Sequence, residues 1–255
     1  MVDLKSAEQI AGMREAGRVV ARALHAMKDA AAPGVTLLEL DEVGHDVLRT
    51  HGATSPFLDY HPRWAPVPFP GVTCISVNDA IVHGIPTSQV LAEGDLVSLD
   101  FGAVLDGWCG DAALSFTVGQ PSARDAELVA ATEEALHAGI SAAQPGSTIG
   151  DIGHAVSRVA RAHKFGVLED HGGHGIGREM HMDPFVPNEG RRGKGMRLSP
   201  GLTIAIEPMF IADGRGDYKH DDDGWTLRTV KGARAAHFEH TIAVTTDGPL
   251  ILTAL

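Results

Sequence analysis

Residues 33–40 read PGVTLLEL and residues 145–152 read PGSTIGDI, so one pattern occurs twice, 112 residues apart. In each copy a Thr is followed three residues later by an acidic side chain, which is a signature of a helix start. His51 and His163 fall at the same offset. Two helix starts that agree by chance are the alternative to a duplicated unit. The repeat predicts two similar halves, approximately 1–120 and 121–255, related by a pseudo-twofold axis.

Around these two stretches the sequence predicts both helices and strands. Residues 6–30 carry a capping box at Ser6 and Gln9 and apolar residues at helical spacing. A second helix begins at Thr36 and ends at Gly52, and a third covers residues 122–143. We expect strands over residues 72–77, 96–104, 112–118, 202–210 and 237–245, where β-branched or alternating residues predominate. Because helices and strands do not alternate regularly, the fold class is α+β, in a single domain over 1–255.

Composition excludes several classes of protein. A net charge of −12 argues against broad binding to nucleic acid or to anionic lipid. The two cysteines, Cys74 and Cys109, do not provide a disulfide framework for a chain of 255 residues. The sequence shows no apolar run of membrane-spanning length and no signal peptide, so we expect a cytoplasmic protein without a membrane partner. Four prolines in residues 61–71 predict a rigid surface loop.

Two acidic residues lie on either side of a strong hairpin signal. Asp106-Gly107 predicts a two-residue turn, which places Asp100 opposite Ala113 and Asp111 opposite Gly102. The two carboxylates then project from one face of the sheet as diagonal neighbours. Both lie in apolar strands, where two carboxylates repel each other unless a cation lies between them. The alternative is a solvated face with two unrelated acids.

Further candidate ligands follow in the second half. Residues 171–177 read HGGHGIG, and His181 follows; glycines allow close approach, and imidazole binds divalent transition metals. A Gly-rich turn with solvated histidines is the alternative reading. Glu207 ends the apolar run LTIAIE, and Glu239 lies in HFEHTIAV. A buried Glu requires a partner or a metal, although either residue could instead lie at a strand edge. Four carboxylates with one imidazole suit Mn, Fe, Co or Zn in a dinuclear hydrolase better than a structural zinc site; they are Asp100, Asp111, His174, Glu207 and Glu239.

Several ordered motifs now support a family resemblance. They are NDAIVHGIP (78–86), residues 99–111, HGIG (174–177), His181, IEPM (206–209), GWT (224–226) and FEHT (238–241). Over nearly its whole length the chain resembles the type I methionine aminopeptidases. Type II enzymes carry a helical insertion between the two glutamates that here lie only 32 residues apart, at 207 and 239.

The resemblance implies the α+β "pita-bread" fold and the hydrolytic removal of initiator methionine from nascent proteins, with preference for a small second residue. It implies two divalent ions (Co, Mn, Fe, Zn or Ni), with Asp111 and Glu239 bridging, Asp100 completing one site, and His174 with Glu207 completing the other. Glu207 would transfer the proton of the attacking water. His181 would bind the carbonyl oxygen, and His83 would contact the leaving nitrogen. The partners implied are N-terminal Met peptides near the ribosome, without nucleic acid, and the protein would be a monomer.

The expected methionine pocket departs from the family pattern. Tyr60 and Trp225 match it, whereas Phe57 stands where a Cys is usual and Met180 where an aromatic residue is usual. Gly102 replaces a common Thr. We expect Phe57, Tyr60, Met180 and Trp225 to surround the methionine side chain, together with His83 and His181 as substrate-binding residues.

Two other functions are compatible with such a fold. Prolidases and aminopeptidases P usually carry an extra N-terminal domain, which this chain is too short to hold. Relatives that only bind RNA or ribosomes typically lose metal ligands and gain basic surface, whereas this chain keeps all five ligands and is acidic.

Overall fold

The computed structural model describes residues 2–255 and contains, in that range, four helices. Their bounds are α1 (Ala7–Ala30), α2 (Leu37–His51), α3 (Ala123–Ala142) and α4 (Ile149–His163). The capping boxes expected at Ser6 and Thr36 are both formed, and Gly52 ends α2 in the left-handed conformation at φ 65°. The three helices expected from the sequence are confirmed. None of the helices in residues 2–255 has both the length and the apolar character that a membrane crossing requires.

Helices α2 and α4 follow the repeat of the sequence. Each has 15 residues, and both their first residues (37 and 149) and their last residues (51 and 163) are 112 apart. The backbone N–H of Thr36 donates to Glu39, and that of Thr148 donates to Asp151, each at 2.8 Å. The two halves therefore use the same local chemistry to begin the same helix.

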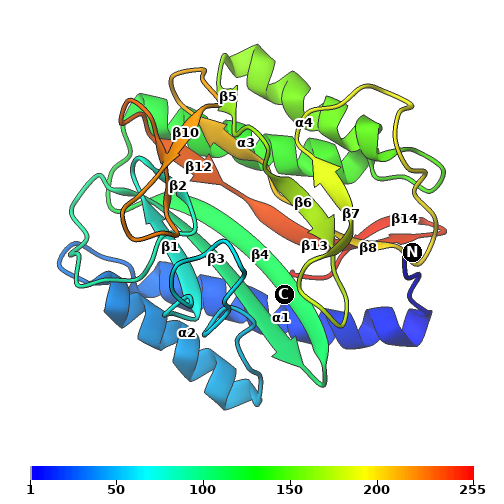
Figure 1. Cartoon of the computed structure of the whole chain (residues 1–255), viewed down its shortest axis with the longest axis horizontal. Helices are drawn as coiled ribbons and strands as arrows, with labels where there is room; N and C mark the ends of the chain where they lie inside the picture. The colour runs from blue at the N-terminus through cyan, green and yellow to red at the C-terminus, as the bar shows by residue number, and fades with distance from the viewer. Residues whose placement is uncertain (1) are drawn as a thin grey trace.

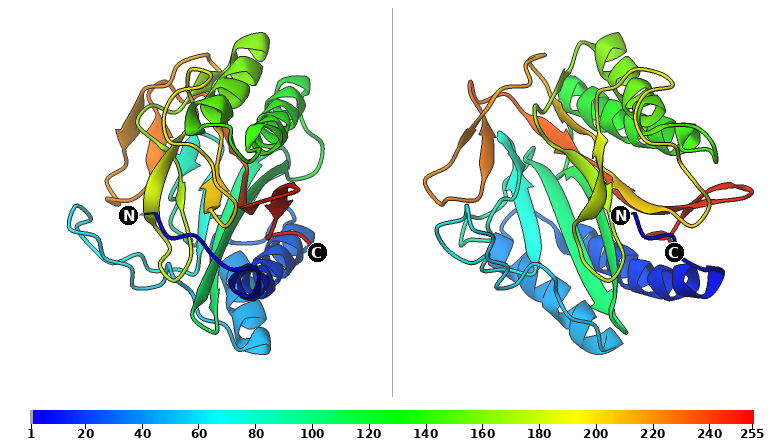
Figure 2. Two further views of the ribbon diagram at one scale, coloured as in Figure 1. Left: turned by 90° about the vertical axis from the view of Figure 1, so that its right-hand side faces the viewer. Right: turned by 45° about the vertical axis from the view of Figure 1, so that its right-hand side comes forward.

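One large sheet joins the two halves (Figures 1 and 2). Its strand order is β1-β3-β4-β13-β8-β6-β7, with β14 paired to β13. The first three strands come from the first half, and β13 connects them to strands of the second half. The bounds are β1 (Thr73–Val77), β3 (Leu96–Leu105), β4 (Trp108–Thr117), β6 (Gly172–Gly175), β7 (Met182–Pro187), β8 (Thr203–Ile206), β13 (Glu239–Thr245) and β14 (Gly248–Ile251).

Two small three-stranded sheets complete the fold. One has the order β10-β11-β2 and the other β12-β9-β5. Their bounds are β2 (Ala80–Val82), β5 (Gly166–Val167), β9 (Met209–Ile211), β10 (Tyr218–His220), β11 (Leu227–Thr229) and β12 (Ala235–His237).

Two of the expected strands are interrupted. The segment 202–210 divides into β8 and β9 at Glu207-Pro208, because proline has no N–H for a sheet ladder. The segment 237–245 divides into β12 and β13 at Phe238, and the two parts join different sheets. Each interruption lies beside a predicted metal ligand.

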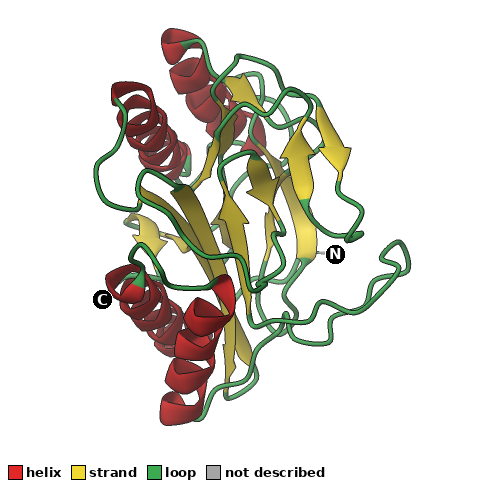
Figure 3. Cartoon of the chain, turned by 90° about the vertical axis from the view of Figure 1, so that its left-hand side faces the viewer, coloured by secondary structure: helices red, strands yellow, loops and turns green. Residues whose placement is uncertain are grey.

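The helix pairs cover one face of the large sheet, as Figure 3 shows. Leu24 and Met27 of α1 pack with Phe101 of β3 in one buried cluster. Leu128 of α3 and Val156 of α4 pack in another. The hydrophobic effect thus fixes the helices to one face and leaves the other face free to carry a site. This is the α+β arrangement of two similar halves that the sequence predicts.

Candidate metal centre

The hairpin of β3 and β4 places the first two carboxylates. Its turn is Asp106-Gly107, with φ of 50° and 73°, and its register pairs Asp100 with Ala113 and Gly102 with Asp111, as predicted. Asp111 is buried, and its main chain is fixed by Thr241 of β13. The Asp111 N–H donates to Thr241 Oγ1 at 3.0 Å, and that hydroxyl donates to the Asp111 carbonyl at 2.8 Å.

Strand β13 brings Glu239 to the same place. Glu239 pairs with Ala113 on one side of β4, and Asp100 pairs with Ala113 on the other side. Three neighbouring strands therefore present acids around one small residue. Glu207 follows β8 directly, and β8 lies on the other side of β13. The four predicted carboxylates come together, although they are as much as 139 residues apart in sequence (100 and 239).

His174 of β6 completes the predicted set. Its Nδ1 lies 2.9 Å from the Gly175 carbonyl, an acceptor, so Nδ1 carries the proton. The unprotonated Nε2 then faces the carboxylates, 3.7 Å from Asp111 Oδ2 and 3.8 Å from Glu207 Oε1. An imidazole oriented in this way by a backbone carbonyl is typical of metal-binding histidines.

The electrostatics of the cluster call for a cation. Burial raises the pKa of Asp100 to about 7. Burial, and then the Asp100 charge, raise the pKa of Asp111 and of Glu207 well above their usual ranges. Burial, followed by the Asp111 charge, has the same effect on the pKa of Glu239. Without a cation these carboxyls retain protons, whereas bound metal ions allow them to ionise together.

The donor atoms fit divalent ions. Among the described residues, Asp100 Oδ1, Asp111 Oδ1 and Glu239 Oε1 are enclosed without a hydrogen-bond partner. Donor atoms of Asp111, His174 and Glu239 lie within 4.8 Å of one another. A second group with the same spacing consists of Glu207, His237 and Glu239. Oxygen-rich groups with imidazole suit first-row transition ions.

His237 belongs to this second group, although the sequence did not single it out. Burial lowers its pKa to about 3, so the ring is neutral. Its position two residues before Glu239 could have signalled the role, since alternate residues of an extended chain share a face.

The cluster forms the floor and one wall of a cavity of about 260 Å³. The other walls are apolar and include the predicted Phe57, Tyr60 and Trp225. Trp64, Phe69 and Cys74 also line the cavity, and the sequence did not indicate them. Cys74 pairs with Asp100 across β1 and β3, a long-range register that no turn signal reveals. Burial, followed by the Asp100 charge, raises the pKa of the Cys74 thiol, which stays neutral.

Met180, expected in this pocket, is not among the residues that line it. A Cβ at Gly102 would lie 2.7 Å from Met180 Cε and 3.1 Å from the ring of Phe57. The three departures from the family pattern therefore lie together. The missing side chain at position 102 leaves the space that Phe57 and Met180 occupy.

The proline-rich segment 61–71 closes the cavity from outside. Its Val67 carbonyl accepts a hydrogen bond from Trp225 Nε1 at 2.9 Å, and the ring of Trp64 lies edge-on to Trp225 at 5.0 Å. Main-chain bonds of 2.9 Å join Asp59 to Phe69 and Phe69 to Tyr60. The loop is thus fixed to the rest of the cavity wall.

His83 and His181 lie at the same cavity. The His181 ring is stacked on Tyr60 and lies 4.4 Å from the His174 ring. Burial lowers the pKa of His181. Burial, and then the charge of His171, lower the pKa of His83 to about 4. His83 has a φ of 60°, a conformation rarely held by a non-glycine residue and one that is enriched at functional sites.

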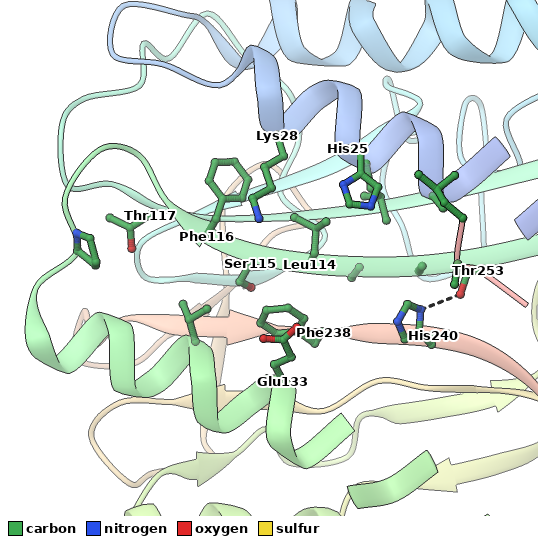
Figure 4. Close-up of a pocket in the computed structure, with 18 of the residues that line it drawn as sticks. His25, Lys28, Leu114, Ser115, Phe116, Thr117, Glu133, Phe238, His240 and Thr253 are labelled. Carbon is green, nitrogen blue, oxygen red and sulfur yellow. Dashed lines mark hydrogen bonds between the residues drawn. The ribbon is translucent and has the colours of Figure 1, made fainter. Parts of the chain in front are cut away.

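A larger cavity of about 540 Å³ lies on the helix side of the sheet, between α1 and α3. Figure 4 shows His25, Lys28, Glu133 and His240 around it, with His240 Nδ1 hydrogen-bonded to Thr253 Oγ1 at 2.8 Å. The predicted site residues line the smaller cavity. Size and chemistry therefore point to different places, and we take the chemistry as decisive because it explains the buried acids.

Comparisons with known proteins agree with this choice. The sequence model of metallopeptidase family M24 matches residues 11–246. Methionine aminopeptidase 1 of Mycobacterium tuberculosis is 51% identical over 99% of this chain and 95% of its own length. Methionine aminopeptidase of Aquifex aeolicus is 42% identical over 100% of this chain and 99% of its own. The crystal structure of methionine aminopeptidase from Thermotoga maritima superposes with a TM-score of 0.95 at 39% identity and covers 100% of both chains.

Proposed function

Because this chain belongs to metallopeptidase family M24, we propose that its smaller cavity hydrolyses the peptide bond that follows an N-terminal methionine. One observation carries the proposal: four buried carboxylates and His174 share a cavity of about 260 Å³ with aromatic walls and a thiol. The unbranched, polarisable side chain of methionine suits aromatic walls, while the acids suit the reacting peptide. The names of the relatives described above support the same substrate.

Two divalent ions (Co, Mn, Fe, Zn or Ni) would be held by Asp100, Asp111, His174, Glu207 and Glu239. Asp111 and Glu239 would be shared between the ions. The two groups of donor atoms support sharing, because Glu239 belongs to both. In such centres the bound ions polarise a carbonyl and make water acidic enough to react near neutral pH.

Glu207 is the proposed proton carrier. It accepts the proton of the attacking water and then delivers it to the leaving amine. Burial raises its pKa, so a proton held there is retained long enough to be transferred.

The two cavity histidines position the peptide. His181, neutral because burial lowers its pKa, donates a ring N–H to the carbonyl oxygen as negative charge develops there. His83 contacts the leaving nitrogen or the peptide that follows it. Its backbone is restrained in a position that supports this role, since the Gly84 carbonyl accepts from the Ile75 N–H at 2.8 Å.

The proposal extends to the cellular role. The substrate is the N-terminus of a nascent chain whose second residue is small, as Val2 is in this chain itself. The enzyme works as a monomer near the ribosome in the cytoplasm. The cavity admits one side chain beside the metal ligands, which supports removal of single residues.

The test uses protein stripped of metal by chelation and then reloaded with each candidate ion. We expect cleavage of Met-Ala-Ser to disappear after stripping and to return with Mn, Fe or Co. An Xaa-Pro peptide measured in parallel separates this activity from that of a prolidase. Full activity after exhaustive removal of metal would overturn the proposal, and preferential cleavage of Xaa-Pro would replace it with the alternative.

A further inference from the structure

His237 is a buried imidazole whose two ring nitrogens have no hydrogen-bond partner in residues 2–255. Only 2% of the residue is exposed. An enclosed polar group without a partner is costly, because it has lost water and gained nothing in exchange. Such a group indicates an absent ligand.

The backbone of His237 is fixed by two hydrogen bonds to one side chain. Its N–H donates to Ser115 Oγ at 2.9 Å, and its carbonyl accepts from the same hydroxyl at 2.8 Å. Ser115 Oγ also lies 2.7 Å from Ser98 Oγ. The main chain at His237 is therefore anchored to strands β4 and β3, the hairpin that carries Asp100 and Asp111.

The ring faces two of the proposed metal ligands. His237 Nε2 lies 3.8 Å from Glu207 Oε2 and 3.9 Å from Glu239 Oε2. Both distances exceed those of hydrogen bonds. They match those of the proposed ligand His174, whose Nε2 lies 3.7 and 3.8 Å from its two carboxylates. Two donor atoms bound to one ion, each at about 2.1 Å, lie at most roughly 4 Å apart.

Glu207 thus lies between two imidazoles. Its Oε1 faces His174, and its Oε2 faces His237. We propose that His237 is a sixth metal-binding residue, whose Nε2 coordinates an ion together with Glu207 and Glu239. This inference rests on the proposed metal-dependent function. It adds a nitrogen donor to the five residues that the family resemblance implies.

An additional imidazole changes which ion the centre prefers. Nitrogen donors favour Co, Ni and Zn, whereas oxygen-only sites favour Mn and Mg. The centre with His237 therefore binds Co and Zn more tightly, relative to Mn, than it would with an amide at this position.

The test replaces His237 by glutamine, which keeps a polar group of similar length but is a poor ligand for these ions. The chain offers a matched control in His240→Gln. His240 follows Glu239 directly, but its ring points to the opposite side of the sheet and bonds to Thr253 (Figure 4).

Equilibrium dialysis then gives the stoichiometry and affinity for Co, Zn and Mn. In His237→Gln we expect the affinity for Co and Zn to fall about tenfold or more, with a smaller loss for Mn. His240→Gln should retain the affinities of the unmodified protein. Equal affinities in the two variants would overturn the inference.

A second measurement needs no variant and does not depend on how His237→Gln folds. In the Co-loaded protein, each coordinated imidazole gives one strongly shifted, exchangeable ring N–H signal in the proton NMR spectrum. We expect two such signals, from His174 and His237. A single signal would contradict the role of His237 while leaving the proposed function intact. By contrast, a protein that binds no ion and still cleaves Met-Ala-Ser would refute the function itself.

Discussion

Removal of metal should make the stability of this protein fall as pH rises from 6.5 to 8. Burial raises the pKa of Asp111, Glu207 and Glu239 well above their usual ranges. In the unfolded chain these groups are ionised throughout this interval, with a pKa near 4. The folded, metal-free protein therefore binds more protons than the unfolded chain. In that case the free energy of unfolding decreases with increasing pH.

The magnitude follows from the number of protons retained. Each carboxyl that keeps its proton lowers the free energy of unfolding by about 1.4 kcal/mol per pH unit, hence by roughly 2 kcal/mol over this interval. For a chain of this size, such a change lowers the Tm by about 4–8 °C. His174, with its pKa lowered to about 4, is neutral in both states above pH 7; its own contribution, a gain of stability with rising pH, lies mainly below the interval.

Thermal melts of chelator-treated protein at pH 6.5, 7.0, 7.5 and 8.0 measure this slope. Adding Mn or Co should flatten it, because bound ions replace the retained protons. Glu239→Gln should reduce the slope by about one proton, whereas Glu133→Gln, on the other side of the sheet, should leave it unchanged. A metal-free Tm that is constant or rises from pH 6.5 to 8 would refute the argument that these acids are buried without compensation.

Further substitutions test single side chains of the site. Glu207→Gln should lower kcat by about 10²–10⁴-fold, because an amide cannot accept the proton of water; metal content is measured in parallel, and an unchanged kcat contradicts the role. His181→Ala should lower kcat more than it raises KM, since its hydrogen bond strengthens with the charge on the oxygen; a change in KM alone would remove it from catalysis. Gly102→Thr should cost about 1–3 kcal/mol, because the new Cβ would lie 2.7 Å from Met180 Cε; denaturation with and without Met180→Ala would show whether that contact is the cause. Phe57→Cys should widen the pocket and change the ratio of kcat/KM for norleucine- and methionine-initiated tripeptides by about tenfold or more; an unchanged ratio would mean that Phe57 does not contact the side chain.

The sequence predicted those parts of the molecule that depend on local chemistry. The register of Asp100 and Asp111 followed from a two-residue turn, because such a turn leaves one pairing that matches the strand twist. The starts of α1 and α2 followed from their capping boxes.

The remaining parts depend on contacts that no local pattern encodes. Cys74 reaches the cavity through the pairing of β1 with β3, and Trp64 and Phe69 reach it because loop 61–71 folds back onto Trp225. His237 was hidden by the expectation of one continuous strand over 237–245. Only the interruption at Phe238 shows that it belongs to a different sheet.

Strand β13 has a consequence for how the chain is synthesised. It lies between β4 and β8 in the sheet, yet it leaves the ribosome 122 residues after the end of β4 (117 and 239). During that interval the edge of β4 has no partner strand, and the acids of the finished hairpin lack the Glu239 needed to complete the metal site. An open strand edge of this kind invites pairing with other chains. The repeat in the sequence therefore does not mark two pieces that could fold in turn, and a nascent chain must shield its first half until the last strand arrives.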